Sequence, residues 1–366
     1  MANITLSRKD INEAVQKVQS IVPTRPTLSI LSSLLVTIEN FTLTLTATDV
    51  QMGMSVTIPS DSKEKLTFAV LAKPFIDLIK TLHAEQVSLE ITDSELTLKC
   101  GTVTSVMQTS SANEYPAFPK LEGKAIDLSK SEIEDILTKV APSVTPDSAR
   151  PLLTGVLFDP LSPPLAVATD GFRLSMFSLA NQKALWDERV VVPAKFFAEV
   201  GKVLVDKKVS FIYSLEQKII LAQLAGTSVF SRVLEGEYPP YEKIIPTSSN
   251  ATLVLLAADL LEQVKRAVIF SKESMNAVQI VATAQEVLVK AQSPTFGQFS
   301  GVVQSAKFSG TDITIAFNSK YLLDYLSVVG EEEISISMTD SLKPVLVTTV
   351  HNNNWRYVVM PFKLNS

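Results

Sequence analysis

The residues best suited to catalysis or metal binding are few and scattered along the chain. The two histidines, His83 and His351, each stand among residues that are not metal ligands, which argues against a histidine base or a zinc site. The single cysteine, Cys100, has no second cysteine to pair with, so we expect a small buried hydrophobe in a reducing compartment. No glycine-rich phosphate loop and no G-x-S-x-G nucleophile elbow occurs. The sequence therefore predicts no catalytic residue, metal or cofactor.

Carboxylates are the remaining candidates for chemistry. The run Glu331-Glu332-Glu333 could supply a carboxylate pair, but it follows Gly330 between a predicted helix and a predicted strand, which favours a solvated loop. A carboxylate-pair hydrolase stays open as an alternative, and it requires a cleft with perturbed carboxyl groups. A second alternative is a repeat scaffold that binds proteins and never DNA.

Composition indicates a globular protein of two or three domains. The chain has 366 residues, a length that exceeds what one hydrophobic core usually organises, and 46% of the residues are hydrophobic and 19% charged. A formal net charge of -5 and a pI near 5.3 are typical of a soluble cytoplasmic protein and not of a strongly basic nucleic-acid binder. We expect neither export nor membrane insertion, because no basic start with an apolar run and no apolar stretch of about 18 residues occurs.

Several markers recur with one period of about 120 residues. The segment Val167–Leu174 (VATDGFRL) has an echo in Ala47–Met52 (ATDVQM) and a fainter one in Ala291-Gln292-Ser293, with spacings of 121 and 123 residues. Three other markers keep the same period: a helix start at Lys73, Lys195 and Lys320, a proline taken to close a strand at Pro116, Pro239 and Pro361, and the openings at Ile4, Ile126 and Leu253. Agreement of four markers predicts three tandem domains, at 1–122, 123–249 and 250–366.

Each repeat has the pattern of an α+β unit. Apolar residues at helical spacing follow a serine cap in Ser7–Ser20 and again in Ser129–Val140, which predicts amphipathic helices. Strict alternation in Thr42–Thr46 and Val87–Lys99 predicts antiparallel strands with one buried face. A second helix is expected at each shared lysine, so each domain holds two helices and antiparallel sheet.

Four segments resemble a known family. Arg25–Leu31 (RPTLSIL), the central ATDGFRL, Tyr238-Pro239 with Tyr241, and Tyr357–Leu364 (YVVMPFKL) resemble the bacterial DNA polymerase III beta subunit, the sliding clamps, over the whole chain. The resemblance implies a non-catalytic processivity subunit that forms a head-to-tail homodimeric ring, with helices lining the hole and sheets outside. Double-stranded DNA would pass through without sequence recognition. The implied protein partners are the replicative polymerase alpha subunit, the clamp loader, and other polymerases and repair proteins.

The resemblance also implies the residues that contact the duplex. A closed ring holds DNA by topology, so it needs no tight electrostatic grip, and the acidic net charge is no objection. By position the expected contacts are Arg25, Lys73, Lys80, Arg150, Lys195, Lys202 and Arg266. Without the resemblance these would be ordinary solvated helix faces.

A cleft between the second and third domains is implied for short peptide motifs of the partners. Its mostly apolar walls suit Leu or Phe anchors of an extended peptide, with Thr169 and Arg173 offering polar contacts that fix its register. Phe172 stands where a His is common, Lys363 replaces a frequent Arg, and Asn365-Ser366 extend the usual end, so the peptide preference stays open. The expected cleft residues are Leu153, Thr169, Gly171, Phe172, Arg173, Leu174, Pro239, Ile244, Leu342, Pro344, Val358, Met360, Pro361 and Phe362.

The subunit seam is expected between an edge strand of domain one, Cys100–Thr109, and the region of Ile269-Phe270 in domain three. Ser105 occupies a position that can carry an aromatic residue in the family, which predicts a weaker seam. The expected interface residues are Ser105, Val106, Met107, Ile269 and Phe270.

Overall fold

The computed structural model describes residues 2–123, 125–182 and 186–363, so Asn365 and Ser366 lie outside the described residues. Its contacts divide the chain into two compact units. Unit 1 contains Met1–Ile133 and Lys195–Val233, and unit 2 contains Glu134–Ala194 and Leu234–Ser366. Within the described ranges, no helix combines the length and apolar character needed to cross a membrane.

Unit 1 is built on a twelve-stranded sheet whose paired strands all run antiparallel. In spatial order the strands are β1 (Ala2–Ser7), β6 (Gln86–Ile91), β7 (Glu95–Cys100), β8 (Val103–Ser111), β5 (Leu66–Leu71), β2 (Ser33–Glu39), β3 (Thr42–Thr48), β4 (Met52–Pro59), β16 (Thr227–Arg232), β15 (Ile219–Leu224), β14 (Lys208–Ser214) and β9 (Ala125–Ser129). Buried and exposed side chains alternate along most of them, as the sequence predicted.

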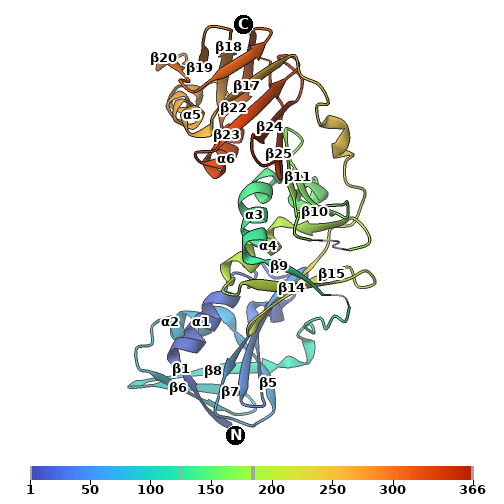
Figure 1. The fold of residues 1–366 in the computed structure, drawn as a ribbon. Helices are drawn as coiled ribbons and strands as arrows, with labels where there is room; N and C mark the ends of the chain where they lie inside the picture. Colours follow the sequence, from blue (N-terminus) through green and yellow to red (C-terminus); the bar gives the residue numbers. More distant parts are fainter. Residues whose placement is uncertain (1, 124, 183–185, 364–366) are drawn as a thin grey trace. The chain divides into compact units, whose positions relative to one another are not determined.

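The helices of unit 1 cover one face of this sheet with apolar stripes. Helix α1 (Arg8–Val18) begins after Ser7, whose hydroxyl accepts a hydrogen bond from the backbone N of Asp10, and it packs beside α2 (Ala72–Lys80) (Figure 1). Helix α4 (Ala194–Lys202) buries Phe196 and Phe197. The predicted helix Ser129–Val140 is present as α3 (Lys130–Asp135) and a π-helical turn, Ile136–Val140.

Unit 2 contains two sheets. The nine-stranded sheet has the order β13 (Val190–Pro193), β10 (Gly155–Asp159), β11 (Leu165–Thr169), β12 (Arg173–Ser178), β25 (Trp355–Val359), β24 (Val345–Thr349), β23 (Glu333–Met338), β17 (Ala251–Leu256) and β21 (Lys307–Gly310). The four-stranded sheet has the order β20 (Gly297–Val302), β19 (Val287–Ser293), β18 (Ala277–Ala282) and β22 (Ile313–Asn318). Helix α5 (Ala257–Ser271) lies against the second sheet and beside α6 (Ser319–Val329) (Figure 1). Short 3-10 turns are formed by Ser29–Ser32, Ala112–Glu114, Ala141–Ser143, Pro151–Thr154 and Tyr241–Ile244.

The same order of strands and helices occurs three times along the chain, with β21 as an additional short strand in the third repeat. The second helix of each repeat begins where the lysine marker predicted, at Ala72, Ala194 and Ser319. One marker was misread, because only Met360-Pro361 directly follows a strand. Tyr115 lies beyond the end of β8 and Tyr238 beyond the end of β16. The Tyr115 hydroxyl donates to the carbonyl oxygens of Ser33 and Thr46 at 3.2 and 3.1 Å, so this side chain fastens the connection onto the sheet.

The two junctions at which strands of successive repeats pair have one register. β4 pairs with β16, with Ser55 opposite Ser228, and β12 pairs with β25, with Met176 opposite Arg356. Paired residues can be followed from strand to strand across the sheet, starting from the residue before the second helix of a repeat. By this route Ser55 and Met176 occupy the same position in their repeats. The same route from the residue before the first helix gives Ser228 and Arg356 the same position in theirs. The two junctions are therefore structural copies of one another.

The expected edge strand Cys100–Thr109 needs correction. Cys100 ends β7, and the β7–β8 turn passes through Gly101, whose φ of 56° lies in the left-handed region. The end of β8 is also paired on its second side, with Thr109 opposite Val70 of β5. Among the described residues, the part of β8 that lacks a second strand is therefore Val103–Gln108.

Candidate functional site

The turn between β11 and β12 is held rigidly by its own side chains. Asp170 Oδ1 accepts hydrogen bonds from the backbone N of Phe172 and of Arg173, at 2.8 and 3.0 Å. Thr169 Oγ1 accepts from the Gly171 N at 3.0 Å and donates to the Arg173 carbonyl at 2.6 Å. Gly171 has a φ of 92°, which only glycine adopts readily. The turn leaves the Phe172 ring 58% exposed beside these fixed groups.

Arg173 connects this turn to α6 through buried contacts. Its guanidinium is 3% exposed and pairs with Asp170 at 3.0 Å and with Asp324 at 2.5 Å. It also donates to the Pro142 carbonyl and lies 4.6 Å from the centre of the Tyr321 ring. Burial acts to lower the pKa of Arg173, but contacts with Tyr357, Asp324 and Asp170 outweigh it, so the pKa is raised and the side chain stays charged.

A largely apolar cavity of about 570 Å³ lies beside Phe172. The C-terminal segment is fixed along it by two backbone hydrogen bonds, from Met360 N to the Phe172 carbonyl at 2.8 Å and from Phe362 N to the Ala316 carbonyl at 3.1 Å. The cavity is lined by Gly171, Phe172, Met275, Asn318, Tyr321, Met360, Pro361, Phe362 and Lys363. Five of the expected cleft residues thus meet here: Gly171, Phe172, Met360, Pro361 and Phe362.

The other expected cleft residues have different surroundings. Leu153, Leu174 and Val358 belong to a buried cluster with Tyr238 and Tyr241. Thr169 and Arg173 use their polar groups inside the protein, so they position the turn instead of presenting free donors. Pro239, Ile244 and Leu342 are exposed and Pro344 is half-buried, and none of the four lines this cavity.

Sequence reasoning missed part of the cavity wall. Asn318 and Tyr321 flank the repeated Ser319-Lys320 helix start, and Asn318 Oδ1 caps α6 by accepting from the Lys320 N at 2.9 Å. The helix marker therefore carried a signal for these two residues. Met275 is 72% exposed in the segment after α5, with no signal in the sequence.

The seven basic residues expected at DNA are all exposed, and most have acidic neighbours. Lys73 pairs with Asp77 at 2.9 Å, Lys202 with Glu199 at 2.8 Å, and Arg266 with Glu262. The pairs of Lys73 and Arg266 are exposed and therefore weak, so phosphate can compete for these two cations, whereas the Lys202 pair has a buried carboxylate. Arg150 also donates to the Asp170 carbonyl at 3.0 Å and so touches the β11–β12 turn. The remaining three are Arg25, in the segment after α1, Lys80, which donates to Gln19, and Lys195, 3.8 Å from Asp49.

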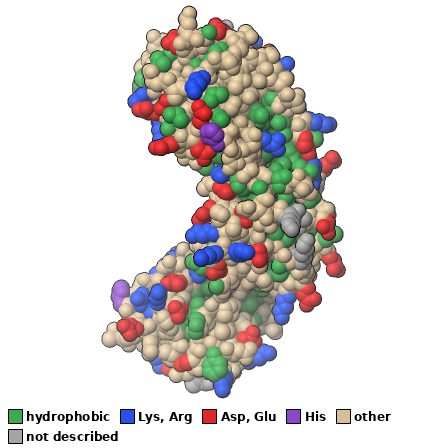
Figure 2. Space-filling model, in the orientation of Figure 1, with side chains coloured by type: hydrophobic (Ala, Val, Ile, Leu, Met, Phe, Trp, Pro, Cys, Tyr) green, Lys and Arg blue, Asp and Glu red, His purple; other side chains and the backbone are tan. Residues whose placement is uncertain are grey.

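Charge gives no further guide to a binding face. Figure 2 shows basic and acidic side chains intermixed on the visible face, without a patch of one sign. In the described part of the chain, no group of three or more His, Cys, Asp or Glu side chains could hold a metal ion. His83 and His351 are exposed, and Cys100 is buried with its thiol 3.7 Å from the Ala84 carbonyl, as predicted.

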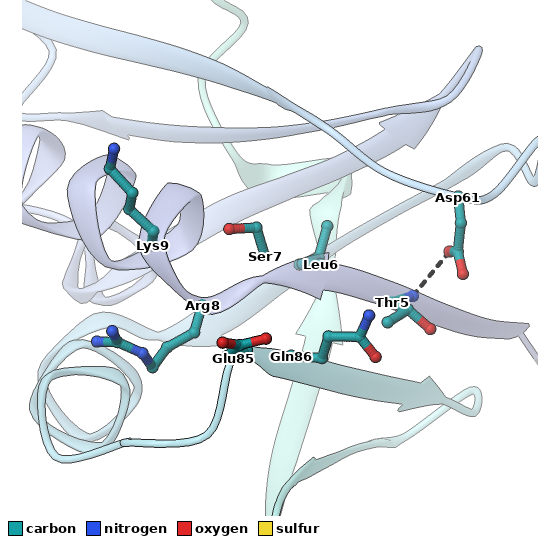
Figure 3. Close-up of a pocket in the computed structure, with 8 residues that line it drawn as sticks. All are labelled: Thr5, Leu6, Ser7, Arg8, Lys9, Asp61, Glu85 and Gln86. Atoms are coloured by element: carbon teal, nitrogen blue, oxygen red, sulfur yellow. Dashed lines mark hydrogen bonds between the residues drawn. The ribbon is translucent and has the colours of Figure 1, made fainter.

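A cavity of about 540 Å³ in unit 1 has two carboxyl groups in its wall and is the candidate for an enzyme site (Figure 3). It lies at the start of α1, where Arg8 and Lys9 follow Ser7. Figure 3 shows its two carboxyl groups, of Asp61 and Glu85, well apart from one another. Asp61 accepts from the Thr5 N at 2.7 Å and so holds β1 in place. The cavity therefore lacks the close carboxylate pair that a hydrolase would need.

Comparisons with known proteins agree on one family. Three profiles of the DNA polymerase III beta subunit match in order: the N-terminal domain at residues 2–119, the central domain at 127–240 and the C-terminal domain at 242–363. The chain is 27% identical to the Beta sliding clamp of Pseudomonas aeruginosa over 99% of this chain and 100% of that protein. It is 28% identical to the Beta sliding clamp of Proteus mirabilis over 98% and 99%.

Solved structures give the same result. The DNA polymerase III subunit beta of Pseudomonas aeruginosa superposes with a TM-score of 0.91 at 26% identity, over 99% of this chain and 100% of that one. The sliding clamp of Bacillus subtilis superposes with a TM-score of 0.93 at 24% identity over 99% of each chain, which supports the fold.

The fold is therefore that of a clamp made of three tandem α+β domains. The chain belongs to the DNA polymerase III beta subunit family, that of the bacterial sliding clamps, and is not an enzyme.

Replacing Arg173 by methionine should destabilise unit 2. The substitution leaves Asp170 and Asp324 without their shared cation, and breaking a buried ion pair costs about 3 kcal/mol. Both tryptophans, Trp186 and Trp355, lie in unit 2, so denaturant unfolding followed by tryptophan fluorescence measures the loss.

Arg266→Met is the matched control, because its pair with Glu262 is exposed and should be worth less than about 1 kcal/mol. Equal stability of the two variants would show that Arg173 does not fasten the turn to α6.

Proposed function

We propose that two copies of this chain form a ring that encircles duplex DNA and tethers the replicative polymerase as its processivity factor. The observation that carries the proposal is a pair of unfilled strand edges. The chain contains two copies of one junction, in which β4 pairs with β16 and β12 pairs with β25. Each of these strands is the last of four neighbouring strands that one repeat contributes to a sheet. Among the described residues, Val103–Gln108 of β8 and the outer side of β20 are the two corresponding edges that lack this partner.

The register of the missing junction follows from the other two. Thr104 holds the position of Ser228 and Arg356 in its own repeat, and Ser300 holds that of Ser55 and Met176. The same junction between subunits therefore puts Thr104 opposite Ser300 of the partner subunit. Two such head-to-tail contacts close a ring of two chains and pair both of these edges.

The seam residues expected from the sequence fit this pairing. Ser105, Val106 and Met107 then oppose the partner's Phe299, the partner's Gln298 and the partner's Gly297. Val106 is 55% exposed and Ile269 is 60% exposed in the single chain, which suits surfaces that become covered. Phe270 of α5 stacks on Phe299 of β20 at 6.1 Å, which joins the helix to the strand edge.

DNA contact is assigned to the exposed cations Arg25, Lys73, Lys80, Arg150, Lys195, Lys202 and Arg266. The exposed and therefore weak ion pairs of Lys73 and Arg266 suit a surface that releases phosphate quickly, and a closed ring retains the duplex without tight contacts. The cavity beside Phe172 is the proposed site for short peptide motifs of the polymerase alpha subunit, the clamp loader, and other polymerases and repair proteins. Its exposed Phe172 and Met275 suit apolar peptide anchors. These partners place the protein in the cytoplasm.

Retention on DNA tests the ring. Loaded by its clamp loader on nicked circular DNA, the protein should stay bound through gel filtration and should be released when the circle is cut, because topology alone holds it. Gln at Lys73, Lys195 and Lys202 should reduce loading without preventing release. A protein that stays on the cut DNA is held by contacts, and one that never remains on circles is a scaffold without DNA function.

Cysteine cross-linking tests the register of the seam. In a Cys100→Ser background, Thr104→Cys with Ser300→Cys should form an intersubunit disulfide, since directly opposed antiparallel residues lie about 4.5–5.5 Å apart between Cα atoms. The control is Thr104→Cys with Phe299→Cys, where a one-residue slip turns the thiols to opposite faces. Stronger cross-linking of the control would refute the register.

Peptide binding tests the cavity. Phe172→Ala should weaken binding of a fluorescent peptide from the cognate polymerase alpha subunit about tenfold or more, as truncation of a central aromatic anchor does. Phe41→Ala is the control, because Phe41 is 49% exposed on the β2–β3 turn of unit 1. Equal affinities, measured by fluorescence anisotropy, would remove Phe172 from the site.

A further inference from the structure

Phe296 is an exposed aromatic residue, and its counterparts counted from the preceding strand, Met52 and Arg173, are buried. It lies in the β19–β20 turn and is 62% exposed. Met52 in the first repeat and Arg173 in the second follow the corresponding turns, and each is only 4% exposed. The first two turns lie at junctions inside the chain, whereas β20 has an open edge among the described strands. Phe296 therefore lies exposed beside an open strand edge, where a second chain would cover it.

The three turns are built alike. Asp49 Oδ1 accepts from Gln51 N and Met52 N, and Asp170 Oδ1 accepts from the backbone N two and three residues on. In the third turn Ser293 Oγ takes this role and accepts from Thr295 N and Phe296 N, at 3.1 and 2.9 Å. The third turn is one residue longer than the second. Phe296 therefore corresponds to Arg173 when residues are counted forward from the preceding strand, β19, and to Phe172 when they are counted back from the following strand, β20.

At both internal junctions the turn faces the second helix of the following repeat. Asp49 lies 3.8 Å from Lys195 of α4. In the next junction Arg173 pairs with Asp324 of α6 and packs on Tyr321. Counting from the helix starts, the corresponding helix for the third turn is α2 of another subunit, where Pro74 matches Tyr321 and Asp77 matches Asp324.

Helix α2 borders a cavity of about 420 Å³ that suits an aromatic ring. Val22, Pro23, Pro26 and Ile76 supply apolar wall, and the remaining lining residues are Gln19, Thr24, Ser32, Lys73 and Asp77. Charge also fits an uncharged occupant. Asp324 needs Arg173 from the neighbouring repeat, whereas Asp77 is already paired with Lys73 on its own helix at 2.9 Å. A phenylalanine in the place of Arg173 thus leaves no carboxylate without a cation.

We propose that Phe296 of one subunit packs into this α2 cavity of the second copy and acts as an apolar anchor of the seam. The inference rests on the proposed ring and adds a contact beside the strand ladder. An aromatic side chain enclosed by apolar wall contributes most when it is fully removed from water. The stability of the seam then depends on burial of the Phe296 side chain and only weakly on salt concentration.

Analytical ultracentrifugation across a concentration series tests this contact. Phe296→Ala should raise the dimer dissociation constant about tenfold or more, and the increase should be similar at low and high salt. Phe41→Ala, a matched exposed phenylalanine away from the seam, should leave it unchanged. A dissociation constant for Phe296→Ala equal to that of Phe41→Ala would overturn the inference.

A double-mutant cycle tests whether the Phe296 side chain occupies the α2 cavity. Val22→Ala should weaken the dimer in the parent chain and have little further effect once Phe296 is alanine, because both changes then remove the same contact. Additive effects would place Phe296 elsewhere. The Thr104–Ser300 cross-link distinguishes the anchor from the proposed two-chain ring. If the cross-link forms while Phe296→Ala has no effect on dimerisation, only the anchor is wrong. If the parent chain stays monomeric and does not cross-link, the proposed two-chain ring is wrong.

Discussion

The backbone hydrogen-bonding groups along a strand edge must find partners, and this constraint organises the whole chain. An unpaired edge presents a row of N–H and C=O groups that either pair with another strand or invite aggregation. Here β4 pairs with β16 and β12 pairs with β25 in the same register, so two potential edges are closed within the chain. A sheet repeated three times along one chain has one such pair left over, and in the proposed ring a second copy satisfies it. Assembly would then be a consequence of the repeat.

The cavity beside Phe172 depends on the second of these junctions. β25 lies next to β12, so the residues that follow it, from Met360 onward, run beside the β11–β12 turn. Arg173 then ties the turn to α6, and the turn presents Phe172 outward from a fixed backbone. A groove formed in this way is largely ready before a peptide arrives, and preorganisation reduces the entropy that binding costs. The same junction that extends the sheet therefore positions the candidate site.

Sequence alone predicted what local patterns determine. The helix starts at Ala72, Ala194 and Ser319 follow from the repeated lysine marker, and the common period made each prediction support the others. Contacts between distant segments were not predictable in this way. Arg173 was read as a polar contact for a peptide because its sequence neighbours do not reveal Asp324, which lies 151 residues away and takes up its charge. The open edge was extended one residue too far, to Thr109, because the pairing of Thr109 with Val70 depends on the fold of the first repeat.

The two internal junctions and the proposed seam share one strand register and differ in the side chain that follows the turn. Met52 and Arg173 serve junctions whose halves are joined by the chain, so a high effective concentration keeps them together with modest side-chain contacts. The seam has no such link and must overcome the entropy of association through its own interactions. Backbone pairing alone is a poor source of affinity in water, because free edges already hydrogen-bond to solvent. In the proposed seam, burial of the exposed Phe296 side chain in the second subunit would supply part of this affinity.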